Sequence, residues 1–317
     1  MSHRVGAGDA APVCATAELV AATALAVRRR VLEHTIDNGG GYLSQACSAA
    51  EILASLYLQV MRLGPSAGPM EPERFPGTPG HGTDRLDLGA RYNGAPDDAL
   101  DRFVLSPAHY ALVLYATLIA VGRLGPDALG QFNADGSTVE MIGAEHSPGM
   151  EVTSGSLGQA LSVAVGRALA RQRRRARGRV WVFMSDGEFQ EGQTWEALQA
   201  AAWLGLDRLG VYVDANGSQC DGPIDQVMPI EPLVAKLRAF GWSAVEVDGH
   251  DPAALHAAAG SGAGRPLAVV CRTSPWRGIP SLRRRAPRLH YVRLDPAEAE
   301  AARADLARAA AAAGVAP

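Results

Sequence analysis

From residue 179 onward, short apolar runs rich in β-branched residues alternate with Ala- and Leu-rich segments of helical length. We expect strands at 179–184, 210–214, 243–248 and 267–271, with helices at 189–203, 230–239 and 251–259 between them. Strands that alternate with helices predict a parallel sheet, because each parallel strand must be reached through a crossover. The pattern therefore predicts an α/β fold: a doubly wound parallel sheet with helices on both faces.

The first half of the chain adds helices and one long irregular stretch to this sheet. Helical spacing predicts helices at about 16–37, 45–61, 107–122 and 155–171, a short strand at "RFVLS", and a last helix from about residue 295. Residues 64–101 are rich in Gly, Pro, Asp and Arg, so we expect an insert outside the core, either a lid or acceptor-recognition loop or a mobile excursion. We expect residues 1–317 to form a single domain.

Composition excludes several classes of function. The chain has 317 residues, is 47% hydrophobic and has a net charge of -3, which predicts a globular protein without an electrostatic reason to bind nucleic acid or an anionic membrane. The arginines at 171–177 are interpreted as a solvated helix end. The four cysteines lack CxxC spacing, and no run is long enough to span a membrane, so we expect a reduced, cytoplasmic protein.

Two polar turns follow consecutive predicted strands, one at Asp186 and one at Asn216. The carboxyl ends of neighbouring parallel strands meet at one edge of a sheet, where such folds bind ligands. Asp and Asn oxygens, with the backbone carbonyl of Ser218, suit Mg²⁺, and the Gly-rich start of the helix near Gly155 suits a phosphate. Together they favour a diphosphate site, although both side chains could instead cap turns.

The spacing of these residues resembles a known motif. Asp186-Gly187 followed by Asn216 is similar to the thiamine diphosphate motif, with Ser185 in place of its first Gly. The blocks "DRFVLSPAHYALVLYATL", "PGMEVTSGSLGQALSVAVGRALA", "DGEFQEGQTWEALQAAAWLGLDRL…VDANGSQCDG" and "VEVDGHD" resemble the transketolase family in the same order. The resemblance implies the diphosphate-binding (PP-type) domain of an enzyme that transfers two-carbon ketol units between sugars.

The resemblance also assigns binding residues. It implies that Mg²⁺ is held by the side chains of Asp186 and Asn216 and by the carbonyl of Ser218. It further implies that thiamine diphosphate is contacted by Gly155, Leu157, Gly187, Glu188 and Cys220, besides the three metal ligands.

Four residues match catalytic or seam positions of the family. His109 stands in the turn "SPAH", His146 precedes "PGME", Glu191 belongs to the "EG" pair near the subunit seam, and His290 is the late histidine. The remaining histidines His34, His250 and His256 match nothing catalytic, so we interpret them as structural.

Three departures put the sugar substrate in doubt. The early S-G-H turn of the family reads "NGG" here, so Gly40 replaces a substrate-handling histidine. Pro107 and Ala108 stiffen the S-x-G-H turn, and Cys220 replaces an apolar residue. We therefore expect a less hydroxylated or carrier-tethered acceptor aldehyde instead of ordinary pentose phosphates.

Thiamine chemistry also needs a carboxylate on the cofactor's aminopyrimidine ring, which the family supplies from a second, pyrimidine-binding domain. The chain is about half the length of a one-chain transketolase, so we expect a separate pyrimidine-domain subunit, with two copies of each chain in the assembly. Two alternatives stay open: the alpha chain of a 2-oxo-acid dehydrogenase, and a non-catalytic partner-binding homologue.

Overall fold

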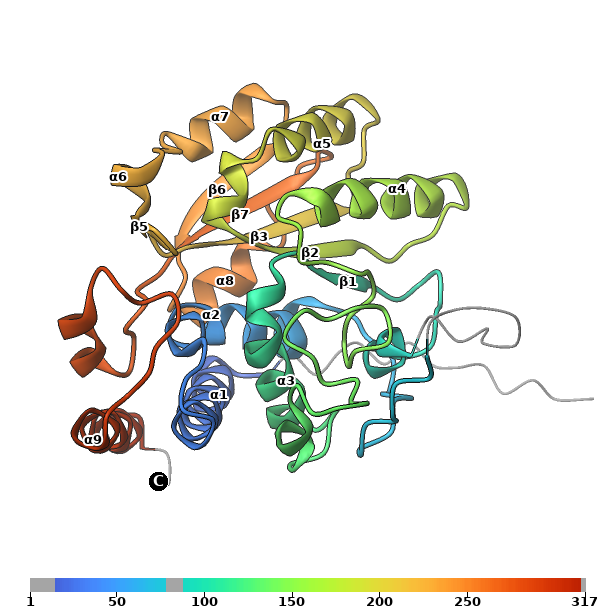
Figure 1. Cartoon of the computed structure of the whole chain (residues 1–317). Helices are drawn as coiled ribbons and strands as arrows, with labels where there is room; N and C mark the ends of the chain where they lie inside the picture. Colours follow the sequence, from blue (N-terminus) through green and yellow to red (C-terminus); the bar gives the residue numbers. More distant parts are fainter. Residues whose placement is uncertain (1–14, 78–87, 315–317) are drawn as a thin grey trace, which may run out of the picture.

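A computed structural model describes residues 15–77 and 88–314 of the chain. Its centre is a five-stranded sheet in the order β1-β2-β3-β7-β6, and every neighbouring pair is parallel (Figure 1). The strands are β1 (Arg102–Leu105), β2 (Val180–Ser185), β3 (Leu209–Ala215), β6 (Ser243–Asp248) and β7 (Leu267–Arg272). The expected doubly wound α/β fold is confirmed, and all five predicted strands are present.

Helices cover both faces of this sheet (Figure 1). One layer contains α1 (Ala17–Asp37), α2 (Leu43–Ser55), α3 (Ala111–Ala120) and α8 (Pro252–Ala258), with α9 (Pro296–Ala312) packed outside α1. The other layer contains α4 (Gln159–Arg173), α5 (Gly192–Trp203) and α7 (Leu233–Ala239), and the short α6 (Ile224–Val227) precedes α7. No described helix is long and apolar enough to cross a membrane.

Side-chain alternation along the strands explains the two layers. Phe103, Phe183 and Tyr212 point into the core beneath α1, α2 and α3. Their neighbours Val182 and Val211 point into the core beneath α4, α5 and α7. A strand buried on both faces needs apolar residues at every position, which is why these strands are continuous apolar runs.

The order of the strands places the two polar turns side by side. β2 and β3 are neighbours in register from Val180↔Leu209 to Ser185↔Asp214, so the turns that follow them share one edge of the sheet. A short antiparallel hairpin follows the turn after β3, and its strands β4 (Ser218–Gln219) and β5 (Gly222–Pro223) have two residues each.

Several helix boundaries differ from the expected ones. α2 ends at Ser55 and is continued by a π-helical turn at Leu56–Val60, and α4 begins only at Gln159 because Gly158 has a left-handed φ of 77°. The region predicted as one helix at 230–239 begins as α7 at Leu233, after Pro232. Proline favours the first turn of a helix, so it marks this start.

The prediction that 64–101 stays outside the core is wrong for part of that stretch. Tyr92 is 3% exposed and belongs to the core, and Asn93 is 1% exposed. Asn93 accepts a hydrogen bond from the Tyr57 hydroxyl at 2.9 Å and donates to Glu151 at 3.0 Å. Residues 78–87, which the same prediction included, lie outside the described residues.

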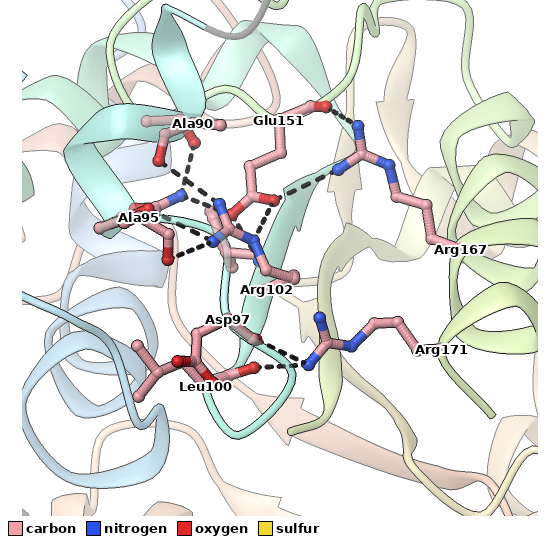
Figure 2. Close-up of polar contacts among 12 residues, drawn as sticks. Ala90, Ala95, Asp97, Leu100, Arg102, Glu151, Arg167 and Arg171 are labelled. Atoms are coloured by element: carbon pink, nitrogen blue, oxygen red, sulfur yellow. Dashed lines mark hydrogen bonds and ion pairs between the residues drawn. The ribbon is translucent and has the colours of Figure 1, made fainter. Parts of the chain in front are cut away.

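Arginines fasten the end of this stretch to β1 and α4 (Figure 2). Arg102 donates to the carbonyls of Ala90, Gly94 and Ala95 at 3.3–3.5 Å and pairs with the Glu151 carboxylate at 2.8 Å. Arg171 is 8% exposed and donates to the Leu100 carbonyl at 2.6 Å, so it does not belong to a solvated helix end as expected. These contacts satisfy backbone groups that an irregular segment would otherwise leave unpaired.

Candidate functional site

A cavity of about 380 Å³ opens at the carboxyl edge of the sheet, between the turns after β2 and β3. Most of the predicted site residues line it: His109, Gly155, Leu157, Asp186, Gly187, Glu191, Asn216, Ser218, Cys220 and His290. The same wall also contains Tyr42, Gln45 and Tyr110, which the sequence did not single out. Residues from six separate parts of the chain therefore meet at one place.

Asp186 and Asn216 lie at the floor of this cavity. The Gly217 N–H donates to Asp186 Oδ2 at 2.8 Å, which ties the two turns together, and the Ser218 N–H donates to Asn216 Oδ1 at 2.9 Å. Burial and the nearby Asp214 carboxylate raise the pKa of Asp186 to about 7. A carboxyl group in this environment gains from a nearby cation, which offsets its loss of solvation.

The donor set around Asp186 suits a hard cation that takes few protein ligands. Residues 15–77 and 88–314 contain no group of three His, Cys, Asp or Glu side chains that could hold a metal. Asp186, Asn216 and the Ser218 carbonyl would contribute only one such side chain, which leaves the other positions for phosphate and water. That division is typical of Mg²⁺ and unlike a zinc site.

Asp214 is a further residue of the site that the sequence analysis missed. Its side chain is fully buried on β3 and accepts hydrogen bonds from Ser48 at 2.5 Å, from Tyr110 at 2.7 Å and from Asn216 Nδ2 at 3.2 Å, besides Thr273. This network orients the Asn216 amide so that its oxygen faces away from Asp214. The sequence contained a sign of this role, because an Asp stands inside the apolar run "VYVDA" and burying an unpaired carboxylate would cost much free energy of folding.

Glu188 is not among the residues that line the cavity, unlike the other residues assigned to the cofactor. It is fully buried beneath the turn and accepts hydrogen bonds from the Ser185 N–H at 2.9 Å and the Gly158 N–H at 3.1 Å, besides the Ser106 hydroxyl. It therefore ties the end of β1, the turn after β2 and the start of α4 together. Because the Gly158 N–H is already used, fewer backbone donors remain for a phosphate there than expected.

Two of the predicted histidines lie next to each other in the wall of the cavity. The rings of His109 and His290 lie 5.0 Å apart, and Tyr42 packs 5.9 Å from His109 and 5.5 Å from His290. Burial and the neighbouring His290 lower the pKa of His109 to about 3, and burial also lowers the pKa of His290. Both imidazoles are therefore uncharged at neutral pH, so each offers one donor and one acceptor.

The other histidines lie elsewhere. His146 is not among the residues that line the cavity, which separates it from His109 and His290. Its Nε2 lies 3.0 Å from Glu140, and its ring packs 4.6 Å from Phe75. His250 contacts the buried Glu51 at 3.1 Å and accepts from the Ser274 N–H at 2.8 Å, as a structural histidine would. His34 packs 4.9 Å from Phe132 in an edge-on contact.

An aromatic side chain occupies the space left by Gly40. A Cβ atom on Gly40 would lie 2.6 Å from Cε1 and 2.9 Å from the hydroxyl of Tyr291, and Gly40 has a φ of 155°. Tyr291 packs against Tyr42 at 5.2 Å, and the chain beside it is fixed by two backbone hydrogen bonds of 2.9 Å between Gly41 and Val292. The space beside Gly40 is therefore filled by an aromatic ring, and that ring packs against Tyr42, which lines the cavity.

Comparison with known proteins agrees with this geometry. The family described as "Transketolase, thiamine diphosphate binding domain" matches residues 97–309. A transketolase family protein of Sinorhizobium fredii is 38% identical and the match covers 87% of this chain and 91% of the relative.

The chain belongs to the transketolase family.

Two further comparisons locate the chain within that family. The 6-deoxy-6-sulfo-D-fructose transketolase subunit of Clostridium sp. is 32% identical, over 80% of this chain and 83% of the relative. The crystal structure of transketolase from Campylobacter jejuni superposes with a TM-score of 0.71 at 20% identity, over 94% of this chain and 43% of that one. The chain thus spans less than half of the solved transketolase, and it contains the thiamine diphosphate-binding domain of this family of transferases.

Proposed function

We propose that the chain is the diphosphate-binding subunit of a two-component transketolase, which transfers a two-carbon ketol unit from a ketose-type donor to an aldehyde acceptor. The observation that carries this proposal is the single cavity in which Asp186 and Asn216, from adjacent strands, lie with His109 and His290. Membership of the transketolase family supports it.

In this proposal Asp186, Asn216 and the Ser218 carbonyl hold Mg²⁺, and Gly155, Leu157 and Gly187 line the bound thiamine diphosphate. When bound, the cofactor would supply the carbanion-stabilising chemistry that the side chains of a protein cannot provide. The buried network around Asp214 keeps the Asn216 amide in place, so the ligand geometry exists before the metal arrives.

The uncharged imidazoles of His109 and His290 have a separate task. Each can hold a proton at one ring nitrogen and accept at the other, which suits hydrogen bonding to a substrate hydroxyl or carbonyl and proton transfer. Gln45 donates to the His290 carbonyl at 3.1 Å and fixes the loop that carries this histidine. Glu191 and Cys220 lie exposed at the mouth, where a partner subunit or a substrate would meet them.

The partner in this proposal is a separate pyrimidine-domain subunit that brings the activating carboxylate. The Clostridium relative is itself named as a subunit, and this chain spans 43% of the Campylobacter enzyme. Two copies of each chain form the simplest closed assembly, and we place it in the cytoplasm. The dehydrogenase alternative has no support from the matched family, and the retained Asp186 and Asn216 argue against a non-catalytic homologue.

The pair formed by Tyr42, which lines the cavity, and Tyr291 packed against it favours an acceptor with fewer hydroxyl groups than a pentose phosphate. Tyr42 and Tyr291 offer ring surface and one phenol each, where an imidazole would bind a sugar hydroxyl. We therefore expect low activity with ribose 5-phosphate and xylulose 5-phosphate, and better turnover of a less hydroxylated or carrier-tethered aldehyde.

Exchange of the thiazolium C2 proton of thiamine diphosphate tests the proposal without knowledge of the substrate. The chain, its pyrimidine-domain partner and their mixture are each incubated with cofactor and Mg²⁺ in deuterated buffer, and exchange is followed by NMR. We expect exchange above the solution rate only in the mixture, and loss of that rate in a mixture made with Asp186→Ala. Fast exchange by the chain alone would refute the two-component assignment.

A further inference from the structure

A second cavity, of about 490 Å³, lies at the opposite, amino-terminal edge of the sheet. Four arginines line it: Arg62, which follows α2 and its π-helical turn, Arg177 and Arg179 before β2, and Arg208 before β3. Arg179 directly precedes the first residue of β2, whose last residue adjoins Asp186. The cavity is therefore separated from the candidate thiamine diphosphate site by the length of a strand.

The positive charge of this cavity is not neutralised by the described residues that line it. Among them Asp101 is the one carboxylate, against four guanidinium groups, although the whole chain has a net charge of -3. His256 on α8 contributes an imidazole to the same wall. Like charges gathered in a concave surface raise the local potential, and anions concentrate there.

The carboxylate oxygens of Asp101 mainly accept hydrogen bonds from two backbone N–H groups and an indole N–H. Its Oδ1 accepts from the Arg179 N–H at 2.8 Å, and its Oδ2 accepts from the Arg62 N–H at 3.0 Å and from Trp181 Nε1 at 3.2 Å. The Arg62 guanidinium lies 3.7 Å from Oδ1, at the outer limit of an ion pair. The carboxylate therefore shapes the floor of the cavity more than it balances the arginines.

Three of the four guanidinium groups donate hydrogen bonds to neutral backbone carbonyls. Arg208 donates to the Arg177 carbonyl, Arg62 donates to the same carbonyl at 3.4 Å, and Arg179 donates to the Ala259 carbonyl at 3.3 Å. Arg179 also lies 5.2 Å over the Trp181 ring. Such contacts orient the planar groups without cancelling their charge, and each guanidinium has five N–H donors to share.

We propose that this cavity binds a small polyanion, of the class of diphosphates and sugar bisphosphates, at a site distinct from the thiamine diphosphate site. Its volume lies in the range of small-ligand pockets, and guanidinium forks match the oxygens of a phosphate group. A bound anion would join the turn before β2, the turn before β3 and the end of α2, which are held together mainly through backbone carbonyls. The ligand would therefore stabilise the fold from the edge opposite the catalytic cavity.

Calorimetric titration of the full chain with inorganic pyrophosphate, in metal-free buffer, tests this proposal. Arg177→Ala and Arg208→Ala remove exposed side chains of the cavity and leave the hydrogen bonds between its backbone groups intact, although Arg208→Ala also removes the hydrogen bond to the Arg177 carbonyl. Because a charge-assisted hydrogen bond is lost, each should weaken binding about tenfold. Arg173→Ala is the matched control, since Arg173 is also exposed but does not line the cavity.

Four results would overturn the proposal. The wild-type chain could fail to bind pyrophosphate, or Arg173→Ala could weaken binding as much as the cavity variants do. Binding that survives both Arg177→Ala and Arg208→Ala would belong to the other edge of the sheet. If a poly-glutamate peptide bound at this cavity and pyrophosphate did not, the surface would dock an acidic protein, which contradicts a small-anion site.

Discussion

The contact between Gly40 and Tyr291 can be tested with a double-mutant cycle. A methyl group at residue 40 would lie 2.6 Å from the Tyr291 ring, well inside van der Waals contact. Tyr291 is 44% exposed, so its ring can turn away, at the cost of its edge-on contact with Tyr42 and the Arg293 guanidinium over its face at 5.3 Å. Losing these two contacts costs about 1–2 kcal/mol.

Backbone strain adds to this cost. Gly40 has a φ of 155°, a conformation that residues with a Cβ adopt only at a cost of about 1–3 kcal/mol. We therefore expect Gly40→Ala to lower the free energy of unfolding by about 2–5 kcal/mol, summing the two terms. Tyr291→Ala removes the ring and its contacts, which costs about 1–2 kcal/mol on the same reckoning.

The double variant Gly40→Ala/Tyr291→Ala should be destabilised by less than the sum of the single variants, because both single variants lose the contacts of the Tyr291 ring and the double variant loses them only once. The expected coupling is about 1–2 kcal/mol. Urea unfolding of the four proteins measures it. Gly39→Ala is the matched control, since Gly39 also has a positive φ, of 65°, but its Cβ would meet nothing within 4 Å.

Additive effects within about 0.5 kcal/mol would show that Tyr291 does not fill the space at Gly40. Coupling between Gly39→Ala and Tyr291→Ala as large as that of Gly40→Ala would show that the effect is not local. The double variant also removes the ring that packs against Tyr42, which lines the cavity. It should then change the acceptor KM of the reconstituted enzyme more than its affinity for thiamine diphosphate.

Three other predictions follow from the site and the core. Asp186→Ala should weaken thiamine diphosphate binding by the reconstituted enzyme at least tenfold, or roughly 1.4 kcal/mol, in a calorimetric titration with Mg²⁺. The control variant Asp207→Ala, at an exposed residue, should leave this affinity unchanged. In steady-state assays His109→Ala should lower kcat about 100-fold and His146→Ala less than twofold, because only His109 lines the cavity. Equal losses of kcat would contradict the placement of His109 in the active site. Burial alone would raise the pKa of Glu51, but the Arg28 guanidinium holds it down to about 2 from 4.5. The resulting stability should be present above pH 4.5 and should fall by about 3 kcal/mol toward pH 2 in unfolding assays. Glu51→Gln should remove most of this pH dependence.

The sequence by itself determined the sheet and most of the cavity wall. Strands buried on both faces must be apolar throughout, so β2, β3 and β7 could be located from their β-branched runs alone. Since parallel strands end at a common edge, the turns at Asp186 and Asn216 could be placed together before any coordinates were known.

Tertiary structure decided which polar groups face the cavity and which support it from beneath. Glu188 and Asp186 stand two residues apart in one turn, yet Glu188 is fully buried and Asp186 lines the cavity, because only Glu188 meets the donors of Ser106 and Gly158. Those donors come from 30 to 82 residues earlier in the chain, a separation that no local pattern encodes. The same holds for Tyr291 over Gly40, a contact made by two loops that meet only when the sheet and its helices have assembled.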